Sequence, residues 1–317
     1  GSYAPARVVP NEWFAGFLDT SDEWIVQRTG IRERRFAADG ESTSDLCEQA
    51  ARRALAAAGV DPAELDLIVV GTLSGDYQMP STACLVQEKL GARRAAAFDV
   101  NSACTGYLTA AQVCESMIVA GKSRRALAIG AETLSRFLDY GDRSTCVLFG
   151  DAAGATVLMP WEECRQGEIL RTTLGSDGAL YDYIIIPGTG AAEPPTPEGL
   201  ARNAHKIRLK GKEVFRFATN KLVELITEML DGTDPDELGL IVPHQVNQRI
   251  IDAALERLGM THEKVMVNID RYANTSAATV PLALDEALTA GRVESGKLVL
   301  LAAFGAGMTW GATLLRW

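Results

Sequence analysis

The chain alternates between segments with apolar residues at helical spacing and short, continuous apolar runs. Residues 44–58 carry apolar positions on one helical face, and Gly59 followed by Asp61-Pro62 ends this pattern. The run Leu67–Val70 is typical of a buried strand. The same reasoning predicts helices over 80–90 and 105–120 and strands over 95–100 and 126–130. Strands that alternate with helices predict an α/β fold around a mostly parallel sheet.

The second half of the chain repeats parts of the first half in the same order. The matching segments are Gly59–Val69 with Gly232–Val242, Ala120-Gly121 with Ala290-Gly291, and Gly154–Leu158 with Gly311–Leu315. We interpret this as an ancient duplication; the alternative is chance similarity among apolar strands. The halves are expected at 1–160 and 161–317, with a loop rich in Pro and Gly at about 187–204 near the join.

Charge and composition exclude several classes of protein. The formal net charge of −10 argues against general nucleic-acid binding, which requires a basic face. No stretch approaches the ~20 apolar residues of a membrane span, and the N-terminus lacks the layout of a secretory signal. The six cysteines contain no CxxC pair, and there are only three histidines. We therefore expect reduced thiols, a cytoplasmic protein and no metal site.

Cys104 is the first candidate for chemistry, because it follows a predicted strand and a turn of small residues and precedes a predicted helix. The positive end of a helix dipole stabilises the thiolate, the form of cysteine that attacks thioesters. Small neighbours such as Ser102, Ala103 and Gly106 leave room for a bulky substrate. The alternative is a buried structural cysteine, the common role of a single thiol.

The internal repeat connects Cys104 with two further polar residues. At the spacing of the second repeated pair, Cys104 matches Asn274, so both are expected where a strand gives way to a helix. His244 directly follows the predicted strand Leu240–Val242. Ligands of open α/β sheets bind beyond the carboxyl ends of the strands, so these three side chains are expected to converge. Their alternative roles are a structural histidine and a helix cap for asparagine.

Three motifs narrow the interpretation to one family of enzymes: VNSACTG, VPHQVNQRI and YANTSAATVPLALDEAL. Together with the segments 19–34, 142–151 and 304–311, they closely resemble the β-ketoacyl-(acyl-carrier-protein) synthase III family of thiolase-like condensing enzymes. The resemblance covers nearly the whole chain. It implies a thiolase-like fold in which the two duplicated α/β halves form a layered αβαβα sandwich.

The resemblance also implies a decarboxylative Claisen condensation that initiates fatty acid synthesis. Cys104 would take the acyl group from an acyl-CoA, and malonyl-acyl carrier protein would then lose carbon dioxide and attack the bound thioester. His244 and Asn274 are suitable neutral donors to the enolate oxygen that forms. A second oxyanion hole is expected from the backbone N–H of Cys104 and one from the loop Gly305-Ala306-Gly307. Many relatives have Gly where Ala306 stands, and a backbone donor survives that change.

By the same resemblance, the adenine of CoA would lie between Trp24 and Arg143, with Thr20 and Arg28 near its polar groups. Gly211, Phe215 and Asn247 match positions along the pantetheine channel. No cofactor is implied, because the CoA thioester is a substrate.

An acidic carrier protein needs a local basic patch on this acidic chain. The basic residues of the segment 205–221 are Lys206, Arg208, Lys210, Lys212, Arg216 and Lys221. Arg216 is the best candidate among them, and Arg249 and Arg257 add charge further along. The alternative for this segment is a solvated strand face, given the spacing of its first three basic residues.

The resemblance further implies a homodimer, and two features depart from the family pattern. Met79 stands where several relatives place a phenylalanine that closes the acyl pocket across the dimer interface, so the primer is expected to be longer or branched. The family also has a strand, expected in the middle of the sheet, just before Gly1.

Other functions on the same scaffold stay open. A secondary-metabolism acyltransferase or a polyketide-priming synthase would keep Cys104 and His244. Elongating enzymes with two histidines fit less well, because Asn274 takes the second position, and plant-type polyketide synthases are longer. A non-catalytic acyl-binding paralogue would be expected to lose part of the triad, which is intact.

Overall fold

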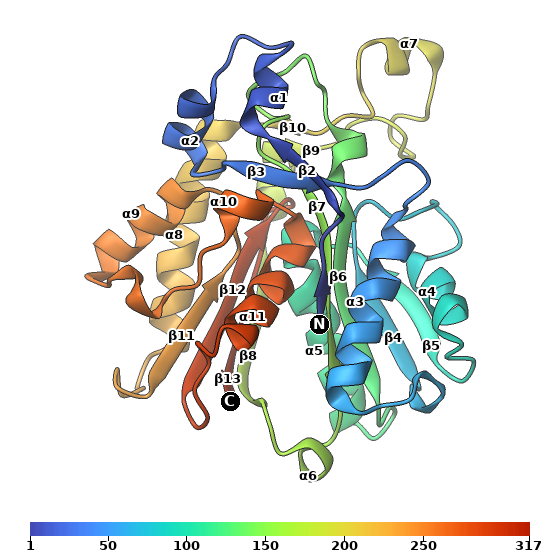
Figure 1. Cartoon of the computed structure of the whole chain (residues 1–317), viewed down its shortest axis with the longest axis vertical. Coiled ribbons are helices and arrows are strands. Elements are labelled where there is room, and N and C mark those ends of the chain that lie inside the picture. The colour runs from blue at the N-terminus through green and yellow to red at the C-terminus, as the bar shows by residue number, and fades with distance from the viewer.

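The computed structural model describes residues 1–317 and contains two large β-sheets (Figure 1). The first sheet has the order β1-β7-β6-β4-β5, and the second has the order β11-β12-β13-β8. The strands of the first are β1 (Ser2–Tyr3), β4 (Leu67–Gly71), β5 (Ala96–Val100), β6 (Ala126–Thr133) and β7 (Asp151–Leu158). Those of the second are β8 (Glu168–Ser176), β11 (Leu238–Pro243), β12 (Leu298–Gly305) and β13 (Thr309–Arg316).

The expectation of mostly parallel sheets is wrong, because both sheets are mixed. Strand β4 runs parallel to β5 and β6, whereas β7 is antiparallel to β6 and β1. In the second sheet only β11 and β12 are parallel. The residues Ala306–Met308 join β12 to β13, and so short a connection permits only an antiparallel pair. Strand β1 lies at an edge, beside β7, and not in the middle of its sheet.

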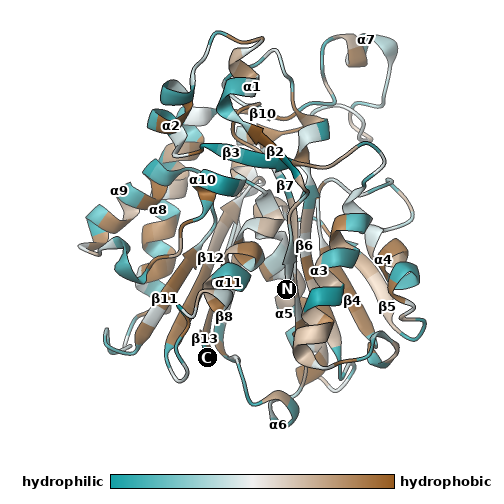
Figure 2. Cartoon of the chain, in the orientation of Figure 1, coloured by the Kyte–Doolittle hydropathy of each residue, from teal (hydrophilic) through white to brown (hydrophobic).

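The helices form three layers around the two sheets. The long ones are α3 (Thr43–Ala58), α4 (Thr82–Leu90), α5 (Gly106–Val119), α8 (Gly211–Met229), α9 (Gln248–Leu258) and α11 (Thr279–Thr289). Helices α3 and α4 cover the outer face of the first sheet, and α8 with α9 covers the second. Helices α5 and α11 contact both sheets and lie between them. This αβαβα order confirms the expected fold class, and Figure 2 shows the strands mostly hydrophobic and the outer helices hydrophilic on their outward faces.

Repeated segments of the sequence occupy equivalent places. Strand β4 corresponds to β11, helix α5 to α11, and strand β7 to β13. All strands of the first sheet come from residues before 160, and all strands of the second sheet come from residues after 160. The two halves therefore bring the starts of their central helices, α5 and α11, toward each other between the sheets, where the apolar residues of both halves form one shared cluster.

Local signals in the sequence account for the element boundaries. Helix α3 begins with a capping box between Ser42 and Asp45 and ends at Gly59, whose φ of 64° is the left-handed conformation that favours glycine. The strand that was the alternative for the segment 205–221 is limited to β10 (Arg208–Leu209), and α8 begins at Gly211.

Smaller elements lie mostly above the ends of the sheets in Figure 1. They are α1 (Asn11–Ala15), α2 (Asp22–Thr29), α6 (Trp161–Cys164), α7 (Pro197–Ala201), α10 (Ile269–Tyr272), β2 (Arg7–Pro10), β3 (Glu33–Phe36) and β9 (Ile184–Ile185). The loop expected over 187–204 contains the short α7. All six cysteines are unpaired, no three metal-binding side chains gather, and no helix has the length and apolarity to cross a bilayer.

Candidate functional site

One large cavity, of about 1160 Å³, lies where the carboxyl ends of β5 and β11 meet the starts of α5 and α11. Most of the residues singled out in the sequence line it: Trp24, Arg28, Cys104, Arg143, Gly211, Phe215, His244, Asn247, Arg249, Asn274, Gly305, Ala306 and Gly307. Four do not: Thr20, Met79, Arg216 and Arg257. The convergence comes from the duplication, because each half supplies its central helix and the turn before it.

Cys104 lies in the tight turn η2 (Ala103–Thr105) between β5 and α5. Ala103 has a φ of +50°, an uncommon conformation for a residue with a side chain, and this turns the chain sharply before the cysteine. Gly305 approaches so closely that an added Cβ would lie 2.7 Å from the backbone N of Cys104. The N–H groups of Cys104 and Ala306 donate no hydrogen bond within the protein. Two backbone donors are therefore available beside the thiol.

The Cys104 side chain is half-buried and lines the cavity. Desolvation by the surrounding protein raises the pKa of its thiol to about 12, because a thiolate loses hydration there, while the nearby Ser276 hydroxyl opposes this rise. The opposite effect that we expect from the start of α5, stabilisation of the thiolate, stays a prediction.

His244 follows β11 directly, and its backbone N–H donates to the carbonyl of Ala302 at 2.7 Å. Its Nδ1 atom lies 2.7 Å from the Thr279 hydroxyl, and its ring meets the Phe304 ring edge to face. Nε2 is buried without a protein partner. Burial lowers the pKa of His244 to about 3, so the ring is neutral. A neutral ring with one unpartnered nitrogen lines the cavity.

Asn274 comes after the short helix α10 and not after a strand, so the expected equivalence with Cys104 is only partial. Instead, its backbone is held against the segment Leu148–Gly150 by two hydrogen bonds. The side-chain oxygen accepts from the backbone N–H of Ser276 at 2.8 Å. Because the oxygen is occupied in this way, the amide nitrogen is left as the group that can donate into the cavity.

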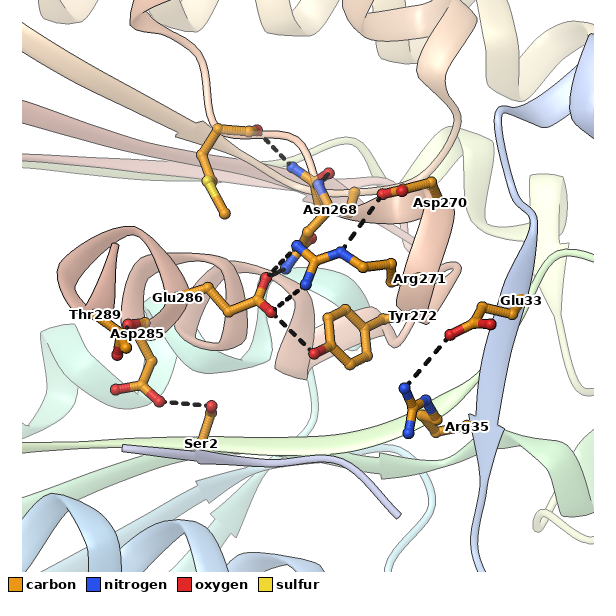
Figure 3. Close-up of polar contacts among 12 residues, drawn as sticks. Ser2, Glu33, Arg35, Asn268, Asp270, Arg271, Tyr272, Asp285, Glu286 and Thr289 are labelled. Carbon is orange, nitrogen blue, oxygen red and sulfur yellow. Dashed lines mark hydrogen bonds and ion pairs between the residues drawn. The ribbon is translucent and has the colours of Figure 1, made fainter. Parts of the chain in front are cut away.

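A carboxylate on α11 fixes the segment that leads into Asn274 (Figure 3). Glu286 accepts two hydrogen bonds from the Arg271 guanidinium, at 2.8 and 3.0 Å, and one each from Asn268 and Tyr272. These donors surround α10, two residues before Asn274. Arg35 of β3 adds its guanidinium over the Tyr272 ring, 5.8 Å from its centroid. The position of Asn274 thus depends on a network outside the cavity.

At the mouth of the cavity, two guanidinium groups already stack on Trp24. Those of Arg28 and Arg143 lie 4.7 and 5.1 Å from the ring centroid, and Arg143 also forms an ion pair with Asp19 at 3.0 Å. In this conformation no flat ring fits between Trp24 and Arg143, so adenine could bind there only after Arg143 moved. Asn247 caps α9 and donates to the carbonyl of Arg28.

The basic candidates for protein docking lie on the neighbouring helices α8 and α9. Arg249 lies over the Phe215 ring at the cavity mouth, and Arg257 donates to the side chain of Asn220. Arg216 is exposed and has no acidic partner. Lys210, in contrast, pairs with Asp182.

Three polar residues of the site were missed in the sequence. Ser276 and Thr279 belong to a quoted motif, and their spacing after Asn274 at a helix start could have marked them. Glu132 gave no such signal, because it is a single carboxylate at the end of the apolar run 126–131. The structure buries it completely and bonds it to Ser276.

Comparison with known proteins supports a common origin over the whole chain. Residues 98–178 match the family described as 3-oxoacyl-[acyl-carrier-protein (ACP)] synthase III, and residues 230–317 match the C-terminal part of the same family. The chain is 49% identical to β-ketoacyl-[acyl-carrier-protein] synthase III of Symbiobacterium thermophilum and 46% identical to that of Desulfitobacterium hafniense. Each match covers 100% of this chain and 96% of the relative.

Solved structures agree with the sequence comparison. The 3-oxoacyl-[acyl-carrier-protein] synthase III of Aquifex aeolicus has a TM-score of 0.91 at 44% identity, over 100% of this chain and 98% of the other. The priming β-ketosynthase of the R1128 polyketide pathway has a TM-score of 0.89 at 35% identity, over 100% and 94%. The chain belongs to the β-ketoacyl-(acyl-carrier-protein) synthase III family of thiolase-like condensing enzymes.

Proposed function

We propose that this chain joins an acyl-CoA primer to malonyl-acyl carrier protein by decarboxylative Claisen condensation, the reaction that initiates fatty acid synthesis. The single observation that carries the proposal is the convergence of Cys104, His244 and Asn274 on one cavity that also contains two unpartnered backbone donors. The family to which the chain belongs supports the same reaction.

In the first half-reaction, Cys104 attacks the thioester carbon of the acyl-CoA and CoA leaves. Negative charge develops on the thioester oxygen, and the N–H groups of Cys104 and Ala306 are the donors proposed to stabilise it. Gly305 has no side chain, which lets the loop of Ala306 approach the cysteine. Substituting Ala306 for the Gly of many relatives leaves this backbone donor in place.

In the second half-reaction, malonyl-carrier protein loses carbon dioxide and its enolate attacks the acyl-Cys104 thioester. His244 and the amide nitrogen of Asn274 are proposed as donors to the enolate oxygen. A neutral imidazole suits this role, because burial keeps its pKa low and a hydrogen bond fixes its orientation. The Thr279 contact leaves Nε2 as the imidazole nitrogen that can face substrate.

Trp24 and Arg143 are proposed to hold the adenine of CoA at the cavity mouth, after Arg143 exchanges its stacking contact with Trp24 for one with the purine. Arg28 would contact polar groups of the nucleotide, and Gly211, Phe215 and Asn247 would line the pantetheine channel. Thr20 lies outside the cavity lining, so it could contact the nucleotide only after the same movement of Arg143. The reaction requires no cofactor in addition to these substrates.

Arg216, Arg249 and Arg257 are proposed to dock the acidic carrier protein. Arg249 contacts Phe215 at the mouth of the cavity, so a carrier bound there would deliver its phosphopantetheine directly into the channel.

We further propose a homodimer that forms along β5, the open edge of the first sheet. Phe98 on this strand is 38% exposed, and Met79, in the loop between β4 and α4, is 84% exposed and lies outside the cavity lining of its own chain. A second copy could place its Met79 at the acyl pocket, where a flexible thioether would admit longer or branched primers. The cytoplasmic location expected from the sequence stays a prediction.

The experiment that tests the function is intact-mass analysis after mixing with a panel of acyl-CoAs, followed by malonyl-carrier protein. The expected result is a mass gain on Cys104 that disappears when malonyl-carrier protein yields a β-ketoacyl product. Persistence of the acyl group until another acceptor is added would favour a secondary-metabolism acyltransferase. Absence of acylation by every chain length would favour the non-catalytic paralogue.

A further inference from the structure

Two threonine hydroxyls lie between the turn that carries Cys104 and the loop Ala306–Met308 that joins β12 to β13. Thr105 is the last residue of the turn η2, is 1% exposed and does not line the cavity. Thr309 is the first residue of β13. The Thr105 hydroxyl donates to the Thr309 hydroxyl at 3.0 Å, although the two residues are 204 positions apart along the chain. The reaction proposed above gives neither side chain a role.

The same two hydroxyls also contact carbonyl groups of the turn and of the loop. Thr105 Oγ1 lies 2.7 Å from the carbonyl oxygen of Ser102, the residue before η2. Thr309 Oγ1 lies 3.1 Å from that carbonyl oxygen and 3.2 Å from the carbonyl oxygen of Ala306. Each hydroxyl has one proton, so the two protons are shared among these contacts. The contacts of Thr309 with Thr105 and with Ser102 both cross from the loop to the turn.

The turn and the loop each carry one of the backbone donors proposed to stabilise the thioester oxygen. These donors are the N–H groups of Cys104 and Ala306, and neither has a partner within the protein. Both donors must lie about 3 Å from the developing negative charge, so the distance between them has to be fixed. Two backbone hydrogen bonds between Met308 and Asp177 fix the far side of the loop. The side near Cys104 has the two threonine hydroxyls instead.

We propose that the hydroxyl contact between Thr105 and Thr309 fixes the distance between the two backbone donors of the oxyanion hole. Thr105 donates to Thr309, and Thr309 donates to the carbonyl of Ala306. The turn that carries Cys104 and the loop that carries Ala306 are thereby held together. Both threonines are positioning residues, and no bond of the substrate forms or breaks at either hydroxyl. The inference rests on the proposed function, because it concerns the oxyanion of that reaction.

The competing explanation is that strand pairing alone fixes the loop. Gly305 lies opposite Thr309 at the end of the antiparallel pair of β12 and β13, and the loop between them is short. The hydroxyls would then only satisfy each other's hydrogen-bonding capacity inside the protein. The two explanations differ in the reactions that they affect. A displaced oxyanion hole slows only those steps in which a carbonyl oxygen becomes negatively charged.

Valine variants separate these explanations, because valine has the shape of threonine without the hydroxyl. Thr105→Val and Thr309→Val each remove one side of the contact, and Thr105→Ser retains the hydroxyl. Thr109→Val is the matched control. The Thr109 hydroxyl lies 2.8 Å from the Ser102 hydroxyl and donates to the carbonyl of Thr105, so it contacts the turn and not the loop.

Three reactions of each variant are measured. Acylation of Cys104 by an acyl-CoA is followed by rapid-quench mass spectrometry, and decarboxylation of malonyl-carrier protein is followed by carbon dioxide release without a primer. Alkylation of Cys104 by iodoacetamide is followed by intact mass. Alkylation displaces iodide and forms no oxyanion, so it reports the reactivity of the thiol alone.

We expect Thr105→Val and Thr309→Val to slow acylation at saturating acyl-CoA by about tenfold or more, because the oxyanion forms only in the transition state. Decarboxylation and alkylation should stay within about threefold of the parent, as should the KM for acyl-CoA in Thr105→Val. Thr105→Ser and Thr109→Val should acylate within about threefold of the parent. If the hydroxyls act through one contact, the double valine variant should be no more than about threefold slower than the slower single variant.

The proposal is overturned if Thr105→Val acylates as fast as the parent, if alkylation or decarboxylation slows as much as acylation, or if the two effects multiply in the double variant. Equal slowing in Thr109→Val would show a general effect on the turn and would also overturn it. If Thr105→Val fails to fold, Thr309→Val compared with Thr309→Ser decides.

Failure of the proposed function gives a different result, in which no acyl-CoA acylates the parent. The contact is then tested with 4-nitrophenyl acetate, because attack of Cys104 on this ester also produces an oxyanion. We expect Thr105→Val to slow acetylation by about tenfold or more, with alkylation unchanged. Equal rates of acetylation in the parent and in Thr105→Val would overturn the inference independently of CoA.

Discussion

The hydroxyl of Thr279, in the first turn of α11, lies 2.7 Å from Nδ1 of His244, at the end of β11. The same hydroxyl donates to the carbonyl of Ser276 at 3.1 Å, which holds it in place. Thr279 thus fixes the imidazole through Nδ1 and leaves Nε2 as the ring nitrogen without a protein partner.

Replacing Thr279 with Val should remove this control over the ring. We expect the rate of malonyl-carrier decarboxylation to fall by at least tenfold, whereas acylation of Cys104 should change by less than threefold. The rates are measured separately, by carbon dioxide release and by intact mass. Thr279→Ser keeps the hydroxyl and should retain most of the parent rate. An equal loss in both half-reactions would contradict this role.

Asp19 should compete with CoA for Arg143, because their ion pair holds the guanidinium on Trp24. Both side chains are well exposed, so solvent screens the ion pair and CoA can displace it readily. Asp19→Ala should therefore lower the KM for acyl-CoA by up to about fivefold, with kcat unchanged. Trp24→Ala should raise the same KM at least tenfold. A rise in KM for Asp19→Ala would mean that Asp19 itself binds the nucleotide.

Glu286→Gln should weaken the network that positions Asn274, because a neutral amide binds the Arg271 guanidinium less strongly. We expect the free energy of unfolding to fall by roughly 1–3 kcal/mol and decarboxylation to slow more than acylation. Asp285→Asn is the matched control on the same helix, since Asp285 bonds Ser2 at the first strand (Figure 3). A similar loss of decarboxylation in Asp285→Asn would show a general effect of α11.

Glu132 should also make stability depend on pH. Its pKa rises from 4.5 to about 7 on folding, so the folded state binds the proton more tightly than the unfolded state. Relative to Glu132→Gln, the parent should lose roughly 3 kcal/mol of unfolding free energy as the pH rises from about 4 to 8. Urea unfolding of both proteins measures this difference. Because His244 is common to both, its own titration cancels. A constant difference across this range would show that the pKa is not raised.

Carrier docking should respond to charge reversal on α8 and α9. Arg249→Glu and Arg216→Glu are each expected to raise the KM for malonyl-carrier protein by about tenfold, with the effect reduced at high salt. Acylation by acyl-CoA should be unchanged in Arg216→Glu, because Arg216 lies outside the cavity. Lys122 follows the C-terminal end of α5, and the cavity lies at the other end of that helix. Lys122→Glu makes the same change of charge and should leave the KM for malonyl-carrier protein unchanged. Equal effects from Lys122→Glu would mean that only net charge matters.

The sequence alone determined the α/β class, the approximate bounds of α3, α4, α5, β4, β5 and β6, and the convergence of Cys104, His244 and Asn274. These features follow from local rules: apolar periodicity selects helix or strand, and Gly59 ends α3 because it adopts the left-handed conformation without strain. The internal repeat predicted this convergence, since the duplicated halves bring the starts of α5 and α11 together, although Asn274 follows a short helix and Cys104 a strand.

Only the tertiary structure decided the directions of the strands, the pKa values of the site residues, and the part played by Ser276, Thr279 and Glu132 around the site. The antiparallel pairs of β7 and β13 depend on how connections run in space, which apolar runs do not encode. The raised pKa of Cys104 results from desolvation by segments that are distant along the chain. Glu132 meets Ser276 across 144 positions of chain, so no local pattern could connect the two residues.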